Sequence, residues 1–149
     1  MIAIRSANLA DLEDLLPRTR ALNEHEGIAI SEDRLRAALR TLLAAPELGG
    51  VWVITREGCI VGYAMATYGF DLEFDGRDAH LTELWVDPLH RGGGSAAAAL
   101  ELLVAELAAN GVNAVHLQVR SDNPAVRLYE RQGFALSHRR IMTRVLGRT

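Results

Sequence analysis

The chain has 149 residues, a formal net charge of −3 and a single cysteine. This length is typical of one domain with its own hydrophobic core, so residues 1–149 are predicted to form a single domain. The slight excess of acidic residues gives a pI of about 5.9, which argues against a nucleic-acid-binding protein. A cationic small molecule suits this charge better as a partner.

The cysteine content and the apolar pattern bear on where the protein works. One cysteine excludes an internal disulfide and a cysteine metal cluster, and no metal site is predicted. Acidic residues occur too early for a signal peptide, and no apolar run approaches the roughly 18 residues of a membrane span. We therefore expect a cytoplasmic protein with no membrane partner.

The first elements are a strand and a helix. Residues 2–5 alternate as a short strand. Asn8, with Asp11 three residues later, resembles a capping box and predicts the start of a helix. Pro17 is expected to kink or split that helix.

A polar connection and a second helix follow. Residues 23–27 are polar and end in a glycine, which predicts a loop. Ser31 is placed to cap the second helix, and Pro46 is placed to end it. Two helices therefore precede most of the sheet.

A β-hairpin is predicted next. Residues 51–55 and 59–68 read as its antiparallel strands, with Cys59 expected to be buried and inert. Gly62, inside the second strand, indicates a bulge or a close backbone contact. Residues 69–79 are acidic and predicted to be a turn-rich connection to the next strand.

Residues 84–100 form the most distinctive stretch of the chain. A strand ending at Val86 leads through Arg91 and three glycines, residues 92–94, into an alanine-rich helix that should end near Asn110. Residues without β-carbons let the backbone approach a ligand, and the first N–H groups of a helix carry partial positive charge. This order predicts an anion-binding site, although three glycines can also form a simple flexible turn.

The remaining chain adds three elements. Residues 113–120 alternate as a strand, and a short helix is expected to begin at Asp122 or Asn123 with Pro124 at its first position. Residues 134–146 are predicted to form the last strand. The complete order, βααβββαβαβ, predicts an α/β or layered α+β domain in which helices flank a mixed sheet.

Two motifs give the chain a resemblance to a known family. Arg91, Gly94 and Ala96 match the pattern R/Q-x-x-G-x-G/A. The segment from Asn123 to Phe134 matches NxxAxxLYExxGF. In this order they resemble the GNAT superfamily of N-acetyltransferases, and residues 68–86 look like its diamine and thialysine acetyltransferase group. The resemblance implies a mostly antiparallel sheet and acetyl-CoA as the cofactor.

The same resemblance implies which residues bind acetyl-CoA. The glycine loop would hold the pyrophosphate through backbone N–H groups, the arginine before it would add charge, and the preceding strand would pair with the pantetheine arm. An asparagine would hydrogen-bond that arm from the other side. The residues implied are Leu84, Trp85, Val86, Arg91, Gly92, Gly93, Gly94, Ser95, Ala96, Asn123, Ala125 and Tyr129.

Transfer to an amine requires a base and an acid, since an alkylamine titrates near ~10.4 and a thiol near ~8.5. The family places the Tyr129 phenol beside the CoA sulfur, which makes it the candidate acid; the alternative is a packing role. Glu83 shares strand parity with Leu81 and Trp85 and interrupts an apolar face, so it is the candidate base, acting directly or through water. A structural ion pair with an arginine is its alternative role. The backbone N–H of Val86 would stabilise the carbonyl oxygen.

The favoured function is acetylation of a primary amine of a small molecule, with a polyamine or a lysine-like amine as the leading substrate class. The alternatives are acetylation of a protein N-terminus or lysine, and a CoA-binding sensor without turnover. A homodimer is possible. The candidate acceptor-facing residues are His25, Glu26, Tyr68, Asp71, Glu73 and Glu83. Of these, His25, Glu26, Asp71 and Glu73 can also be solvated surface residues.

Overall fold

The computed structural model describes residues 1–147 and divides the chain into two compact units. The first unit comprises residues 1–118, and the second begins at Val119. The expectation of a single domain stays a prediction.

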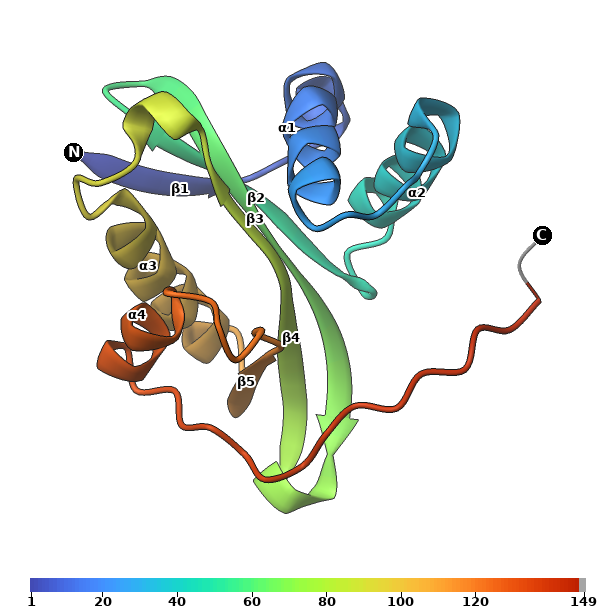
Figure 1. Ribbon diagram of the computed structural model, residues 1–149, viewed down its shortest axis with the longest axis vertical. Helices are drawn as coiled ribbons and strands as arrows, with labels where there is room; N and C mark the ends of the chain where they lie inside the picture. Colours follow the sequence, from blue (N-terminus) through green and yellow to red (C-terminus); the bar gives the residue numbers. More distant parts are fainter. Residues whose placement is uncertain (148–149) are drawn as a thin grey trace. The chain divides into compact units, whose positions relative to one another are not determined.

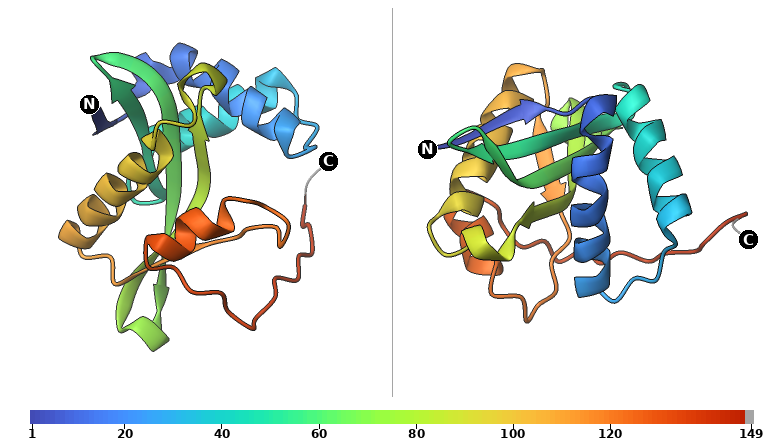
Figure 2. Two further views of the ribbon diagram at one scale, coloured as in Figure 1. Left: turned by 60° about the vertical axis from the view of Figure 1, so that its left-hand side comes forward. Right: turned by 90° about the horizontal axis from the view of Figure 1, so that it is seen from above.

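The first unit is built on a five-stranded sheet with the order β1-β2-β3-β4-β5. Its elements are β1 (Ile2–Ser6), α1 (Leu12–His25), α2 (Glu32–Ala44), β2 (Gly49–Arg56), β3 (Cys59–Asp71), β4 (Gly76–Val86), α3 (Ser95–Ala109) and β5 (Ala114–Leu117). Neighbouring strands are antiparallel except β4 and β5, which are parallel. Helices α1 and α2 cover one face of the sheet and α3 covers the other (Figure 1, Figure 2). This arrangement confirms the predicted fold class.

Apolar burial holds the helices to both faces of the sheet. Leu15, Val53 and Tyr63 are 0% exposed and form part of the core under α1 and α2. Ile54 and Ala99 belong to the core under α3. Val53 and Ile54 are neighbours in β2 and face opposite sides, so one strand contributes to both cores. Full burial of each large apolar side chain contributes about 1.5–3 kcal/mol.

The predicted capping box is present at the start of the first helical segment. The Asp11 carboxylate accepts a hydrogen bond from the backbone N–H of Asn8 at 2.9 Å, and the Asn8 side chain caps the turn in return. A short 3-10 turn follows and continues into α1. The predicted split at Pro17 does not occur, because α1 is one continuous helix. Proline removes the hydrogen bond to the carbonyl of Glu13, which lies in an exposed turn where water can reach it.

The loop predicted at residues 23–27 is wrong in part, because α1 extends to His25. Asn23 is buried, and its side-chain amide donates to the carbonyl of Thr19 over 2.8 Å. This bond satisfies a polar side chain inside the helix, which composition alone does not reveal. The helix is followed by Gly27 in a left-handed conformation.

Strands β3 and β4 form a hairpin in which both extend into the connection predicted between them. The turn-rich connection expected at residues 69–79 is reduced to a 3-10 turn, Leu72–Phe74, and Asp75. Antiparallel pairing of the two strands overrides the weak strand preference of these acidic residues. Cys59, expected to be buried, is exposed at the first position of β3.

A β-bulge at Thr82 changes the direction in which the end of β4 faces. Met65 pairs with Glu83. The next residue of β3, Ala66, pairs with Leu81, which leaves Thr82 as an extra residue in β4. Neighbouring residues of β3 face opposite sides of the sheet, so Leu81 and Glu83 do as well. The predicted shared face of Leu81 and Glu83 is therefore wrong.

Between residues 119 and 147 the second unit contains one helix, α4 (Val126–Arg131). The Asn123 side chain accepts a hydrogen bond from the backbone N–H of Ala125 at 2.9 Å, just before this helix. The last strand, predicted at residues 134–146, is wrong, because this segment forms neither strand nor helix. A strand requires a hydrogen-bonded neighbour, and no ladder to this segment forms within residues 1–147. No helix in that described range is long and apolar enough to cross a membrane.

Removal of the Asp11 carboxylate should destabilise the first unit. Arg5 donates to both carboxylate oxygens at 2.9 and 2.8 Å, and these hydrogen bonds hold the pKa of Asp11 below its ordinary value of 3.8. This stabilisation is present above pH 3.8 and is lost as the pH falls through the lowered pKa. Asp11→Ala should cost about 1–2 kcal/mol in urea unfolding at pH 7. The exposed neighbour Asp14, changed to alanine, is the control; equal losses in both variants would contradict the role of Asp11.

Candidate active site

Glu83 and Tyr63 lie together on the side of the sheet that α1 and α2 cover. The Tyr63 hydroxyl donates a hydrogen bond to Oε1 of Glu83 over 2.5 Å. Trp85, two residues beyond Glu83, packs against the same apolar core as Tyr63. Among residues 1–147, no arginine forms an ion pair with Glu83. The carboxylate is therefore held by a phenol at the margin of an apolar core.

Burial controls the acidity of this pair. It raises the pKa of the Glu83 carboxyl above its ordinary 4.5, and the hydrogen bond from Tyr63 opposes part of that rise. Burial is also the main cause that raises the pKa of Tyr63. The negative charge of Glu83 and the hydrogen bond between the two side chains raise it further, so the phenol stays protonated and remains a donor. Glu83 thus takes up protons at a higher pH than a solvated glutamate does.

The end of β4 leaves one backbone edge open. The last residue of β4 that pairs with β5 is Leu81, so residues 82–86 have no partner in that strand. The N–H of Asp87 points toward β3, where it donates to the carbonyl of Val61 over 2.8 Å. Successive N–H groups of a strand point to opposite edges, so the N–H of Val86 faces the open edge. An extended ligand arm can pair with such an edge as an added strand.

The glycine loop leads from this edge to the start of α3. Gly92 and Gly94 have φ values of +88° and +77°, a left-handed conformation that favours glycine. A β-carbon at either position would meet nothing within 4 Å. Helix α3 begins at Ser95, and its N-cap residue, Gly94, provides no side-chain cap. The first amide groups of α3 are therefore suited to binding an anion.

Two arginines lie near the loop and make different contacts. Arg91 donates through Nε to the carbonyl of Val86 over 2.7 Å, and its guanidinium carbon lies 4.4 Å from the centre of the Trp85 ring. Arg56, at the end of β2, donates through Nη2 to Oγ of Ser95 over 2.9 Å. Arg56 therefore places positive charge at the first turn of α3, the region where the sequence motif led us to expect Arg91.

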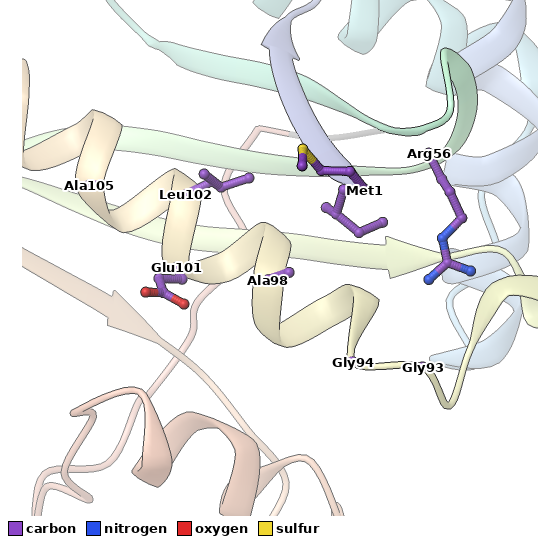
Figure 3. Close-up of a pocket in the computed structure, with 9 residues that line it drawn as sticks. Met1, Arg56, Gly93, Gly94, Ala98, Glu101, Leu102 and Ala105 are labelled. Atoms are coloured by element: carbon purple, nitrogen blue, oxygen red, sulfur yellow. The ribbon is translucent and has the colours of Figure 1, made fainter.

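A pocket of about 590 Å³ adjoins the glycine loop. Figure 3 shows it between α3 and the first residues of β1, with the Arg56 side chain extending toward Gly93 at one end. Its volume falls in the range of small-molecule sites, about 300–1,000 Å³. The lining residues are Met1, Ile2, Arg56, Gly93, Gly94, Ala98, Glu101, Leu102 and Ala105.

An ion pair fixes the point where β4 gives way to the loop. Arg18 of α1 donates to the Asp87 carboxylate through Nε at 3.0 Å and through Nη2 at 2.7 Å. The same Nη2 donates to the carbonyl of Ile60 at 3.1 Å. The two side chains are only 20% and 24% exposed, which strengthens a charge-assisted contact of this kind. The contact ties α1 to β3 and to the entrance of the glycine loop.

The residues predicted to face an acceptor are only partly brought together. His25, at the end of α1, has its ring centre 6.4 Å from that of Trp85, on the same side of the sheet as Glu83. Glu26 follows His25 and is exposed. This end of α1 therefore lies near the proposed base.

The other predicted acceptor residues lie at the far end of the hairpin. Strand alternation places Asp71 on the Glu83 side of the sheet. Asp71 accepts a hydrogen bond from the backbone N–H of Glu73 at 2.9 Å. Tyr68 faces the opposite side, with the guanidinium carbon of Arg77 4.4 Å from its ring centre. Tyr68 and Glu83 therefore do not share a face of the sheet.

Tyr129, Asn123 and Ala125 belong to the second unit. The ring centre of Tyr129, in α4, lies 5.9 Å from that of Phe134 in an edge-to-face arrangement. The contact between Asn123 and Ala125 shapes the turn before α4. The expected roles of these residues toward a cofactor stay predictions.

Sequence reasoning missed the partners that tertiary structure supplies. From the sequence alone, Tyr63 is an ordinary aromatic residue of an apolar strand and Arg56 is a residue of a turn. Arg18 carries no motif at all. Gly62 gave a local signal in this region. A β-carbon there would lie 2.1 Å from the carbonyl oxygen of Trp85, which confirms the close backbone contact predicted for Gly62.

The sequence matches the model of the acetyltransferase (GNAT) family over residues 11–134, which confirms the resemblance drawn from the two motifs. Uncharacterized N-acetyltransferases of Mycobacterium tuberculosis and Mycobacterium bovis are 38% identical over 82 residues, covering 54% of this chain and 49% of theirs. The chain thus spans about half the length of these curated relatives. The finer resemblance to diamine acetyltransferases stays a prediction.

Solved structures share the fold over nearly the whole chain. An integron cassette protein from the mobile metagenome of Cole Harbour Salt Marsh is 29% identical with a TM-score of 0.85, covering 98% of this chain and 91% of that one. A predicted acetyltransferase of Clostridium acetobutylicum, crystallised with acetyl-CoA, is 21% identical with a TM-score of 0.78, covering 98% and 97%. At this identity the second similarity concerns the fold alone.

The raised pKa of Glu83 should appear as a pH-dependent stability. Below pH 4.5 the carboxyl is protonated in both the folded and unfolded states, and the stability it provides is lost as the pH rises through the higher folded pKa. The free energy of unfolding of Glu83→Gln should therefore depend less on pH between 5 and 8 than that of the parent, in urea titrations. The exposed Glu24, changed to glutamine, is the control and should retain the parent slope. Parallel curves for Glu83→Gln and the parent would contradict this assignment.

Proposed function

Because the chain belongs to the acetyltransferase (GNAT) family, we propose that it transfers an acetyl group from acetyl-CoA to the primary amine of a small molecule. The observation that carries this proposal is the half-buried Glu83 carboxylate, whose pKa is raised, on the strand segment with an open edge that leads into the glycine loop. A proton acceptor, a backbone edge and an anion-binding helix end therefore follow one another along the chain.

The residues of the first unit fit acetyl-CoA. The left-handed glycines and the uncapped start of α3 suit a diphosphate, and Arg56 adds a cation beside them. The open edge of residues 82–86 suits the amide groups of an extended arm. When bound, acetyl-CoA supplies a thioester whose carbonyl carbon an amine can attack.

Glu83 is the proposed base. An alkylamine with a pKa near ~10.4 is almost entirely protonated at neutral pH, so it must lose a proton before it can attack. A carboxylate with a raised pKa accepts that proton more readily than a solvated glutamate. The proton moves to a carboxylate oxygen, directly or through one water, while the Tyr63 hydroxyl holds Oε1 in place.

Two further groups complete the proposed mechanism. The N–H of Val86, which faces the open edge, is the donor proposed to stabilise negative charge on the carbonyl oxygen. Tyr129 is the proposed acid, whose phenol hydrogen would pass to the departing sulfur. The support for this role is the position of Tyr129 in the family motif.

A small cationic amine is the proposed acceptor class, with polyamines and lysine-like amines first in order. The acidic side chains on the Glu83 side of the sheet favour a cation; Asp71 at the far end of β3 and Glu26 beyond α1 are the predicted examples. The proposed setting is the cytoplasm, and a homodimer stays a prediction that light scattering can check.

One assay separates this function from its alternatives. Thiol release is measured with acetyl-CoA and a panel of diamines, amino acids, lysine peptides and peptides with a free N-terminus. The chain contains 16 arginines and no lysine, so lysine self-acetylation cannot contribute to the background. Turnover with small amines supports the proposal, and turnover with peptides alone favours a protein acetyltransferase. Binding of CoA by calorimetry without turnover on the whole panel favours a sensor.

Tyr63→Phe should shift the pH dependence of the reaction. The Tyr63 hydrogen bond lowers the pKa of Glu83, so its loss raises that pKa further and moves the acidic limb of the kcat/KM profile to higher pH. In a Glu83→Gln background the same change should leave the profile unaltered, because no carboxylate remains. A shift that persists in that background would show that Tyr63 acts through another group.

Tyr129→Phe should reduce kcat by about 10² to 10⁴ without weakening acetyl-CoA binding, as expected for the loss of a general acid. Phenylalanine keeps the aromatic ring and its contact with Phe134, so the change isolates the hydroxyl group. The measurements are steady-state thiol release and calorimetric titration with CoA. An unchanged kcat would remove Tyr129 from the mechanism and leave it a packing role.

A further inference from the structure

Four potential metal ligands gather on one face of the sheet, away from the glycine loop. They are Asp71 of β3, Asp78 and His80 of β4, and His116 of β5, and we call them the Asp/His cluster. Asp78 and His80 alternate along β4 and therefore share a face. His116 pairs directly with His80 across the parallel β4 and β5 ladder. Asp71 lies two residues beyond Gly69, the partner of Asp78 in β3.

The side chains of the Asp/His cluster lie close together, although most of their distances are longer than those between ligands of one ion. Nε2 of His116 and Nε2 of His80 lie 3.2 and 3.8 Å from the same oxygen, Oδ2 of Asp78. Ligand atoms of Asp71, Asp78 and His116 lie within 4.8 Å of one another. A charge-assisted hydrogen bond is shorter, about 2.7–2.9 Å. Ligands about 2.0–2.2 Å from a tetrahedral zinc are about 3.3 Å apart, so small side-chain rotations suffice to close the cluster on one ion.

Asp78 provides a second, independent indication of a ligand. Its side chain is only 7% exposed, and its Oδ1 atom is buried without a hydrogen-bond partner among residues 1–147. An unpartnered buried polar group costs about 1–3 kcal/mol, and more if it is charged. Arg77, the neighbouring cation on β4, faces the opposite side of the sheet, over the ring of Tyr68. A cation held by both oxygens of the Asp78 carboxylate would remove this cost.

The two imidazoles favour a metal ion over another cation. The ring centres of His80 and His116 are 5.0 Å apart, so two protonated rings would repel each other. Neutral imidazole nitrogen and carboxylate oxygen are common zinc ligands. Phe74 packs against His116 with ring centres 5.4 Å apart, which restricts the orientation of that ring.

We propose that Asp71, Asp78, His80 and His116 form a binding site for a divalent transition metal, with Zn²⁺ as the ion of best fit. The ion would join the end of the β3 and β4 hairpin to β5. Figure 1 shows this end of the hairpin reaching past α1 and α2. The proposal does not rest on the acetyltransferase activity.

The test is a zinc titration of the full chain, prepared without an affinity tag and stripped of metal with a chelator. Calorimetry should register binding of a single Zn²⁺ per chain. Zinc should also raise the temperature of unfolding, because a ligand that binds only the folded state stabilises it. Mg²⁺ should not compete, since imidazole ligands do not suit it.

The variants locate the site. His116→Asn and His80→Asn should each weaken zinc binding at least about tenfold. Mutation of a residue that only hydrogen-bonds to a metal ligand already lowers metal affinity by about this factor. Asp78→Asn should do the same where circular dichroism shows that it folds. His138→Asn removes an exposed histidine of the second unit and should bind zinc like the parent.

Three results would overturn the proposal: no response of the parent to zinc, equal zinc affinities of His116→Asn and the parent, or competition by Mg²⁺. If His116→Asn changes stability while zinc has no effect on the parent, Asp78 is held by an imidazolium and the metal site is ruled out.

Discussion

The extra residue at Thr82 is the constraint on which the site depends. Without it, β4 would keep a constant alternation, and Glu83 would share the face of Leu81. The bulge turns Glu83 and Trp85 toward the core under α1 and α2, where the Tyr63 hydroxyl donates a hydrogen bond to the carboxylate. Beyond Leu81 the strand also loses its partner in β5. The bulge thus lies directly before the proposed base and at the start of the backbone edge that β5 leaves unpaired.

The surroundings hold this irregular segment in place. The Arg18 and Asp87 pair fastens the end of β4 to α1, and the Arg91 side chain folds back onto the carbonyl of Val86. Both contacts satisfy groups at the end of a strand that lacks a neighbour on one side. Neither contact caps the start of α3, so the first amide groups of that helix stay suited to binding a ligand.

Two carboxylates on the same face of the sheet differ in the hydrogen-bond partners that their surroundings provide. Glu83 has a hydrogen-bond donor, the Tyr63 hydroxyl, and its pKa rises because the apolar core disfavours its charge. Asp78 has two imidazole nitrogens at distances too long for strong hydrogen bonds, and one of its oxygens has no partner in the described chain. The first arrangement suits proton transfer, whereas the second suits coordination of a cation.

The sequence alone was sufficient for local features. It predicted the capping box at Asn8, the hairpin, the glycine loop and the family, because capping, turn and phosphate-binding signals are carried by residues close together in the chain. It overestimated the last strand, and it missed the bulge at Thr82 and the placement of Tyr63 and Arg56. These depend on strand register and on contacts between residues far apart in the chain, and only the tertiary structure decides them. A strand forms where a partner edge is free, and a buried charge is tolerated where a distant side chain reaches it.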